Sequence, residues 1–136
     1  MCDSTKIEYI EMKNLNAIPI YMFSGNSSLI TAKLDNASMI GYSAFTNCTN
    51  LQYIEFPNVT VLSNYNYWGD NYVMSTFYNC QKLSVLVFGA SQAVSFSGTF
   101  NGFLNYTPIS TSTYLGYFGS IYVQKSLIAK YAAEPK

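Results

Sequence analysis

Apolar residues recur along this chain with one spacing, which is L-x-x-I-x-F in its fullest form. Residues 51–56 (LQYIEF) show it, and the copies are 7–12, 29–34, 51–56 and 83–88, with a degenerate fifth at 118–123. The first three copies begin at equal intervals, and the fourth follows after a longer one. In each copy the last two apolar positions are two residues apart, which predicts a short strand on which they face one side.

A second landmark keeps register with the first. At a constant distance before three of these copies stands a phenylalanine, and shortly after it comes an asparagine or a cysteine. Two independent landmarks predict stacked parallel units, with the phenylalanines crossing the core on the return leg. The asparagine and cysteines would form an internal column at a turn. The expected internal positions are Phe23, Phe45, Phe77 and Phe100, with Asn26, Cys48 and Cys80 in the column.

Residues 40–57 (IGYSAFTNCTNLQYIEFP) resemble a BspA-type leucine-rich repeat, whose pattern is roughly I-G-x-x-A-F-x-x-C-x-x-L-x-x-I-x-(L/F)-P. Residues 120–127 resemble the I-Y-V-P-x-S-L motif that closes such arrays, with Gln124 in place of the proline. The resemblance covers most of residues 7–128. It implies a β-rich, leucine-rich-repeat fold of the α/β class: a short, right-handed, curved solenoid with a parallel sheet of about five strands and irregular return legs. It also implies a cell-surface or secreted protein of a microbe.

The length of 136 residues suits one domain. We expect repeats at about 7–28, 29–50, 51–82 and 83–117, followed by a closing strand and cap at 118–136. The cap would be a short helix with Ser126 as its N-cap. No comparable cap precedes the first strand, so we expect that the chain is the C-terminal part of a longer protein or that something else covers this strand. Its open edge also predicts self-association.

Two repeats are longer than the others, and the excess predicts extruded loops. One lies around 63–72 and the other between Phe100 and Phe118. The first combines Tyr and Trp with Ser, Gly and Asn, a mixture that is typical of paratopes. Its rings either fold back over the flank of the repeats or contact a ligand, and both interpretations stay open. The candidate contact residues are Tyr65, Tyr67, Trp68 and Tyr72.

Alternation along the strands also defines an outward face. Its two rows read Tyr9, Thr31, Tyr53, Val85, Ser120 and Glu11, Lys33, Glu55, Val87, Tyr122. Three charges in the second row indicate that this face is exposed to solvent. Toward the C-terminus both rows become apolar, so a loop covers that part or a partner binds it. The candidate binding residues on this face are Tyr53, Val85, Val87 and Tyr122.

Composition removes several functions. Charged residues make up 10% of the chain and seven basic residues balance seven acidic ones, so nucleic-acid binding is not expected. No apolar run reaches the roughly 18 residues of a membrane span. Histidine is absent and the carboxylates are scattered, so we expect no catalytic residue, metal site or cofactor. A Cys48–Cys80 disulfide is possible, but two buried, reduced thiols are favoured.

The leading hypothesis is therefore a non-catalytic recognition or adhesion module that binds a protein or glycan through the strand face and the aromatic loops. One alternative is a structural spacer or tip domain of a surface or phage-tail-like fibre. Another is an intracellular adaptor or inhibitor, because this chain shows no signal peptide and a cytoplasmic location stays open.

Overall fold

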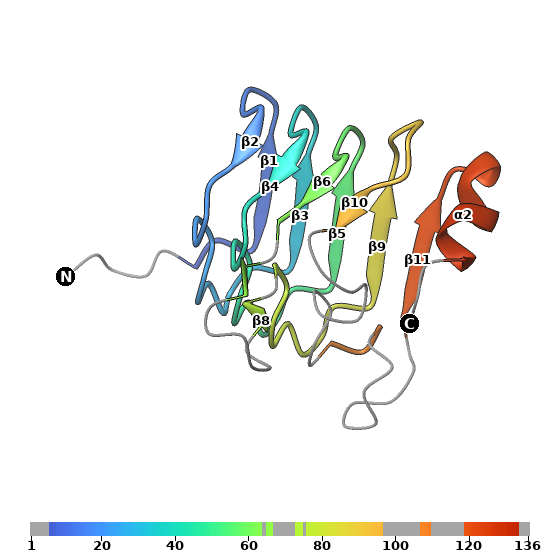
Figure 1. The fold of residues 1–136 in the computed structure, drawn as a ribbon. Helices are drawn as coiled ribbons and strands as arrows, with labels where there is room; N and C mark the ends of the chain where they lie inside the picture. Colours follow the sequence, from blue (N-terminus) through green and yellow to red (C-terminus); the bar gives the residue numbers. More distant parts are fainter. Residues whose placement is uncertain are drawn as a thin grey trace.

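A five-stranded parallel sheet forms one layer of the molecule (Figure 1). The structure is a computed structural model that describes residues 6–63, 65–66, 73–74, 76–96, 107–109 and 119–133. Each strand of the sheet falls within one of the five predicted copies, and the strands follow one another in sequence order. They are β1 (Tyr9–Met12), β3 (Thr31–Leu34), β5 (Tyr53–Phe56), β9 (Val85–Phe88) and β11 (Ser120–Val123).

Equal positions of successive repeats lie side by side in this sheet. Ile54 is paired with Ala32 on one side and with Leu86 on the other. Glu55 is likewise paired with Lys33 and Val87. The longer interval between the third and fourth copies therefore leaves the register intact, because the extra residues leave the layer before the next strand begins.

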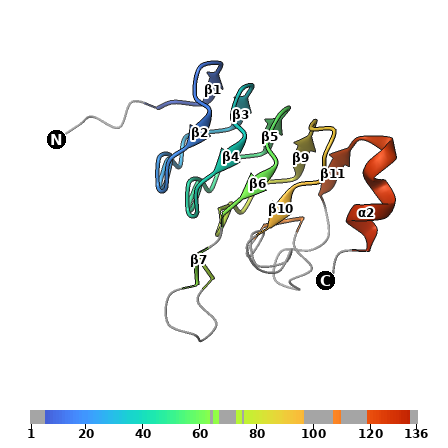
Figure 2. The ribbon, with the colours of Figure 1, turned by 45° about the horizontal axis from the view of Figure 1, so that its top comes forward.

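A second parallel sheet forms the opposite layer (Figure 2). Here the sequence-based prediction of irregular return legs was wrong. The legs carry two-residue strands in the order β10-β6-β4-β2. Backbone hydrogen bonds link successive legs: Ser38 N donates to Asn16 O at 2.8 Å, and Thr60 N donates to Ser38 O at 2.9 Å. Ile18, Ile40 and Leu62 recur there and are buried, so the legs have an apolar pattern of their own. These strands are β2 (Ala17–Ile18), β4 (Met39–Ile40), β6 (Val61–Leu62) and β10 (Ser95–Phe96).

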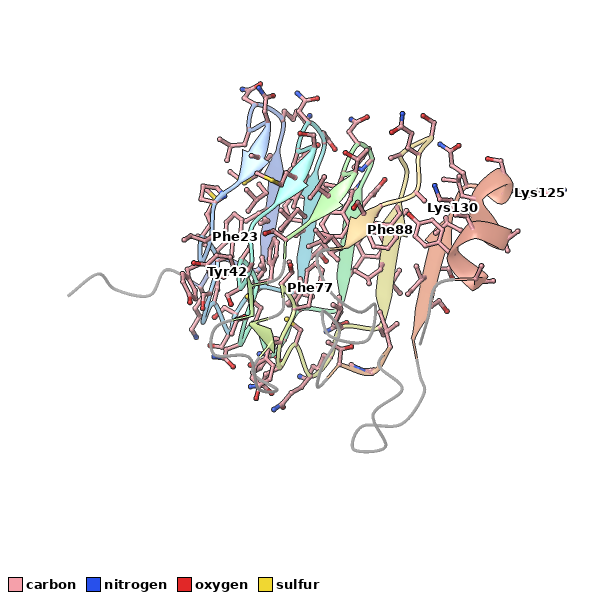
Figure 3. The ribbon with its side chains drawn as sticks, in the orientation of Figure 1. Phe23, Tyr42, Phe77, Phe88, Lys125 and Lys130 are labelled. Carbon is pink, nitrogen blue, oxygen red and sulfur yellow. The ribbon has the colours of Figure 1, made fainter. Side chains whose placement is uncertain are left out.

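The core lies between the two layers, and stacked phenylalanines run through it. Phe23 stacks on Phe45 with ring centroids 5.1 Å apart, and Phe45 stacks on Phe77 at 5.6 Å. Phe45 and Phe77 are fully buried, whereas Phe23 of the first repeat is half-buried. A second stack joins Phe56 to Phe88 at 5.6 Å. Figure 3 labels Phe23 and Phe77 of the first stack and Phe88 of the second. The other position expected in the first stack, Phe100, lies outside the described residues.

Asparagine side chains and one glycine hold successive repeats close together. The Asn58 side chain donates to Asp35 O at 2.5 Å, and Asn50 donates to Ser27 O at 2.7 Å. These bonds satisfy backbone groups at the turns, which would otherwise lack partners. At Gly41 a Cβ atom would lie 2.7 Å from Ile20 N, so a side chain there would push the neighbouring repeat away. Gly41 therefore allows the close approach of the first two repeats.

The C-terminal segment packs beside β11 at the end of the stack (Figure 1). It consists of a 3-10 helix, η1 (Lys125–Leu127), and an α-helix, α2 (Ile128–Ala132). Tyr131 stacks on Phe88 at 5.9 Å, and its hydroxyl accepts a hydrogen bond from Val94 N at 2.8 Å. The prediction of Ser126 as an N-cap was wrong. Ser126 lies inside η1, because the helical turns begin directly after Gln124. The side-chain amide of Gln124 donates to Gly89 O at 2.6 Å.

Candidate functional site

The outward face of the five-stranded sheet brings the predicted strand residues together. Tyr53 of β5 is the neighbour of Val85 of β9, and Val87 of β9 is the neighbour of Tyr122 of β11. These four residues therefore form one continuous group across three strands. Tyr122 is the most open of them, with 57% of its surface exposed.

Beside this group, three polar side chains on β3 and β5 are linked. The Tyr53 hydroxyl donates to Glu55 Oε2 at 3.0 Å, and Lys33 Nζ lies 3.5 Å from the same oxygen. Partial burial and the hydrogen bond to Glu55 raise the pKa of Tyr53, and the charge of Glu55 raises the pKa of Lys33. Each shift favours the protonated forms that make these contacts, so the arrangement persists at neutral pH.

The same tyrosine–glutamate pair recurs on β1. The Tyr9 hydroxyl donates to Glu11 Oε2 at 3.3 Å, and Lys13 Nζ lies 3.1 Å from Glu11 Oε1. The hydrogen bond from Lys13, followed by its charge, lowers the pKa of Glu11. Lys33 is the cross-strand neighbour of Glu11, yet its ion pair is with Glu55. The first three strands thus present a polar and ordered half of the face.

The other half of the face is apolar. Val85 and Val87 are half-buried, and β9 and β11 carry no charged residue. Beyond Tyr122 the surface continues into a groove of about 520 Å³ between β11 and α2. Its lining residues are Ile121, Tyr122, Val123, Ile128, Tyr131 and Ala132. Sequence reasoning missed this groove, although the spacing of Ile128, Tyr131 and Ala132 was a signal for an apolar side of the helix.

The described part of the first insertion contains two short paired strands, which we call the hairpin. Its strands β7 (Tyr65–Asn66) and β8 (Val73–Met74) are antiparallel, with Tyr65 opposite Met74. In Figure 2 the labelled strand β7 lies away from the two layers. Turn-forming residues between the strands, such as Gly69 and Asn71, were the missed signal. The other predicted contact residues, Tyr67, Trp68 and Tyr72, lie outside the described residues.

The internal column contains thiols that are not suited to catalysis. Cys48 and Cys80 are free and buried, and each thiol donates to a carbonyl of the preceding repeat at 3.0 Å, Phe23 O and Phe45 O respectively. Burial raises the pKa of Cys48 to about 12 and raises the pKa of Cys80 as well. Asn26, the first member of the column, is half-buried. Thiols held in the neutral form are poor nucleophiles.

Metal-binding clusters and membrane-spanning helices are both absent from the part of the chain that the structure describes. No group of three or more Cys, Asp or Glu side chains is placed to hold a metal ion there. None of the described helices has the length and apolar character to cross a membrane. The surface features that the structure offers are thus the outward face, the groove beside α2 and the hairpin.

Comparison with models of protein families gave one finding. The model described as BspA type leucine rich repeat region (6 copies) matches residues 1–74, which is more than half of the 136 residues. Searches among curated proteins and among solved structures found no match. The matched range ends at β8, and β9 and β11 continue the same register beyond it.

Proposed function

Because the chain belongs to the BspA-type leucine-rich repeat family, we propose that it is a non-catalytic recognition module that binds a protein or glycan through the outward face of its sheet. The family is generally non-catalytic and typically surface-associated, which suggests protein interaction or adhesion. A surface-exposed or secreted location in a microbe is part of this proposal. Neither nucleic acid nor the membrane interior is among the proposed partners.

The observation that carries the proposal is the division of the outward face into two halves. One half holds hydrogen-bonded Tyr53, Glu55 and Lys33, which are fixed polar groups. The adjoining half offers Val87 and the open ring of Tyr122. Protein–protein interfaces combine an aromatic or apolar centre with a polar rim, so this division supports a binding role.

The hairpin is the second part of the proposed interface. Tyr65, Tyr67, Trp68 and Tyr72 would add rigid aromatic contacts. A spacer or tip domain of a fibre is the competing function, and it has no need of either feature. We also propose that the coils wind as a short, right-handed, curved solenoid, because parallel crossovers are right-handed in nearly all proteins.

The test is a binding screen against mammalian glycans and cell-surface proteins, with circular dichroism to verify that every variant folds. In one variant Val87 and Tyr122 are changed to Ser. Its matched control changes Tyr9, which lies on the same face at the other end and has a similar exposed fraction, 53% against 57%. We expect at least tenfold weaker binding for the first variant and unchanged binding for the control.

A third variant changes Tyr65, Tyr67 and Trp68 to Ser and tests the hairpin separately. If this hairpin variant loses binding while the variant at Val87 and Tyr122 still binds, the interface lies on the hairpin and not on the sheet face. No binding by the unaltered protein would contradict the recognition function and favour the spacer. Equal loss in the Tyr9 control would show that the apolar half has no special part.

Self-association through the open edge of β1 is also proposed. Sedimentation of the unaltered protein over a hundredfold range of concentration tests it, and a constant monomer mass would contradict it.

A further inference from the structure

Among the described strands, β11 has a neighbour in the sheet on one side only, which is β9. In a parallel sheet, alternate residues direct their backbone N–H and C=O groups to opposite sides. Ser120 N donates to Ser84 O at 2.7 Å, so Ser120 and Tyr122 face β9. The backbone groups of Ile121 and Val123 therefore point to the open edge, where the described part of the chain provides no partner for them.

This open edge borders the groove between β11 and α2. Ile121 and Val123 are half-buried there, whereas Leu86 and Phe88, their neighbours in β9, are 0% and 2% exposed. On the opposite wall Ile128 has 54% of its surface exposed. The groove of about 520 Å³ thus combines an apolar lining with a row of backbone hydrogen-bonding groups. An added strand would use both.

Charge indicates the kind of strand that fits. The net charge of zero conceals an asymmetry: residues 1–70 carry six acidic and three basic side chains, and residues 71–136 carry one and four. Every charged residue that the structure describes beyond Glu55 is a lysine. Two of these, Lys125 of η1 and Lys130 of α2, belong to the helical segment beside the groove, although neither is a lining residue (Figure 3). In the described part of the chain no carboxylate forms an ion pair with either.

We propose that an extended, acidic peptide segment of a partner protein docks in this groove as a sixth strand of the sheet. Its backbone hydrogen-bonds to Ile121 and Val123, and its apolar side chains at alternate positions pack on Ile128 and Ala132. Its negative charge is attracted to the positive helical segment that carries Lys125 and Lys130. Strand addition to an exposed edge gives affinity through backbone bonds and specificity through alternate side chains. The site adjoins the outward face at Tyr122, but it uses the backbone edge of β11 and does not depend on the function proposed above.

The test uses the full chain and a blocked synthetic peptide, IEYIEM, which is the sequence of residues 7–12. This probe contains all of β1, which forms a strand in the same kind of sheet, and it has two glutamates. In NMR titrations we expect the amide signals of Ile121 and Val123 to shift, and their hydrogen exchange to slow at least tenfold. A probe with lysine in place of both glutamates should bind more weakly, and one N-methylated at alternate residues should not bind.

Two matched protein variants locate the site. Ile128→Glu puts a charge in the groove, and Ile20→Glu puts the same charge on another exposed isoleucine, far along the chain. We expect Ile128→Glu to weaken binding at least tenfold and Ile20→Glu to leave it nearly unchanged. Tyr122 is kept in both, because it borders the outward face as well.

The proposal is overturned if millimolar probe leaves the Ile121 and Val123 amides unchanged. Shifts restricted to β1 or to Val85 and Val87 would overturn it as well. So would side-chain shifts at Ile128 without any change in the backbone of β11, because these would indicate apolar contact without strand addition. None of these results bears on the screen with the outward-face variants, so the two proposals fail independently.

Discussion

The middle repeats and the end repeats share one sequence pattern but differ in burial. In β3, β5 and β9 the inward residues are buried and the outward ones half-buried. In β1 and β11 the same positions are half-buried and exposed. Ile54 and Ile10 occupy equivalent positions, yet only Ile54 has a repeat on each side. Burial is thus supplied by neighbouring repeats rather than by the repeat itself.

The two ends also differ from each other. At the C-terminal end, α2 covers part of the last repeat, and Tyr131 extends the Phe56–Phe88 stack. At the other end, Phe23 begins the first stack and is half-buried. The half-buried residues at the two ends are therefore where a partner adds most burial. The following predictions test this comparison, from the largest expected effect to the smallest.

The phenylalanine stack provides the largest contrast. Phe45→Ala should lower the free energy of unfolding by about 3–5 kcal/mol, because the ring is fully buried and leaves a cavity. Phe23→Ala removes an equivalent ring that is only half-buried. It should therefore lower the free energy of unfolding by less than about half the loss expected for Phe45→Ala. Urea denaturation of both variants measures the two costs. Equal costs would mean that the first repeat is as well covered as the second.

The thiol column gives a prediction that depends on pH. Burial raises the pKa of Cys48 to about 12, whereas an unfolded thiol has a pKa of about 8.5–9. The contribution of the buried Cys48 thiol to stability is thus fully present below about pH 8.5. It is lost as the pH rises toward 12, because in that window only the unfolded chain releases the thiol proton. The limiting slope is about 1.4 kcal/mol per pH unit for each thiol.

The measurement compares denaturation of the unaltered protein and of Cys48→Ala at several pH values from 7.5 to 10.5. Tyrosine ionisation affects both proteins alike, so the thiol contribution is the difference between them. We expect this difference to shrink as the pH rises. A constant difference would show that Cys48 ionises equally in the folded and unfolded states, and would contradict its place in a closed column.

Much of this arrangement could be predicted from the sequence, because a constant repeat length determines which residues become neighbours. The pairing of Lys33 with Glu11 and Glu55 follows from that spacing alone. The strands of the return legs were missed because each is too short for an alternating pattern to be recognised. The groove was missed because it depends on where α2 packs against β11, which no local spacing determines.

Removal of one methylene group at equivalent positions of two repeats is expected to have a smaller effect on the free energy of unfolding. Ile54→Val should cost about 0.5–1.5 kcal/mol, because the side chain is fully buried between two repeats. Ile10→Val should cost less than Ile54→Val, since β1 has a neighbour on one side only. Thermal denaturation at matched concentration checks both. A larger cost at Ile10 would show that the β1 edge is covered in solution, for example by a second copy of the chain.

The smallest effect is expected on the polar half of the outward face. Lys33→Met removes the ion pair with Glu55, which is exposed and therefore screened by water and salt. We expect the midpoint of denaturation to stay within the error of the curve in both low and high salt. Val87→Lys would place a second charge directly beside Glu55, with which it is paired in the sheet, and should be tolerated equally well. If either variant is markedly less stable, the polar half contributes to the fold, and its ordered tyrosine–glutamate pairs would no longer be evidence for binding.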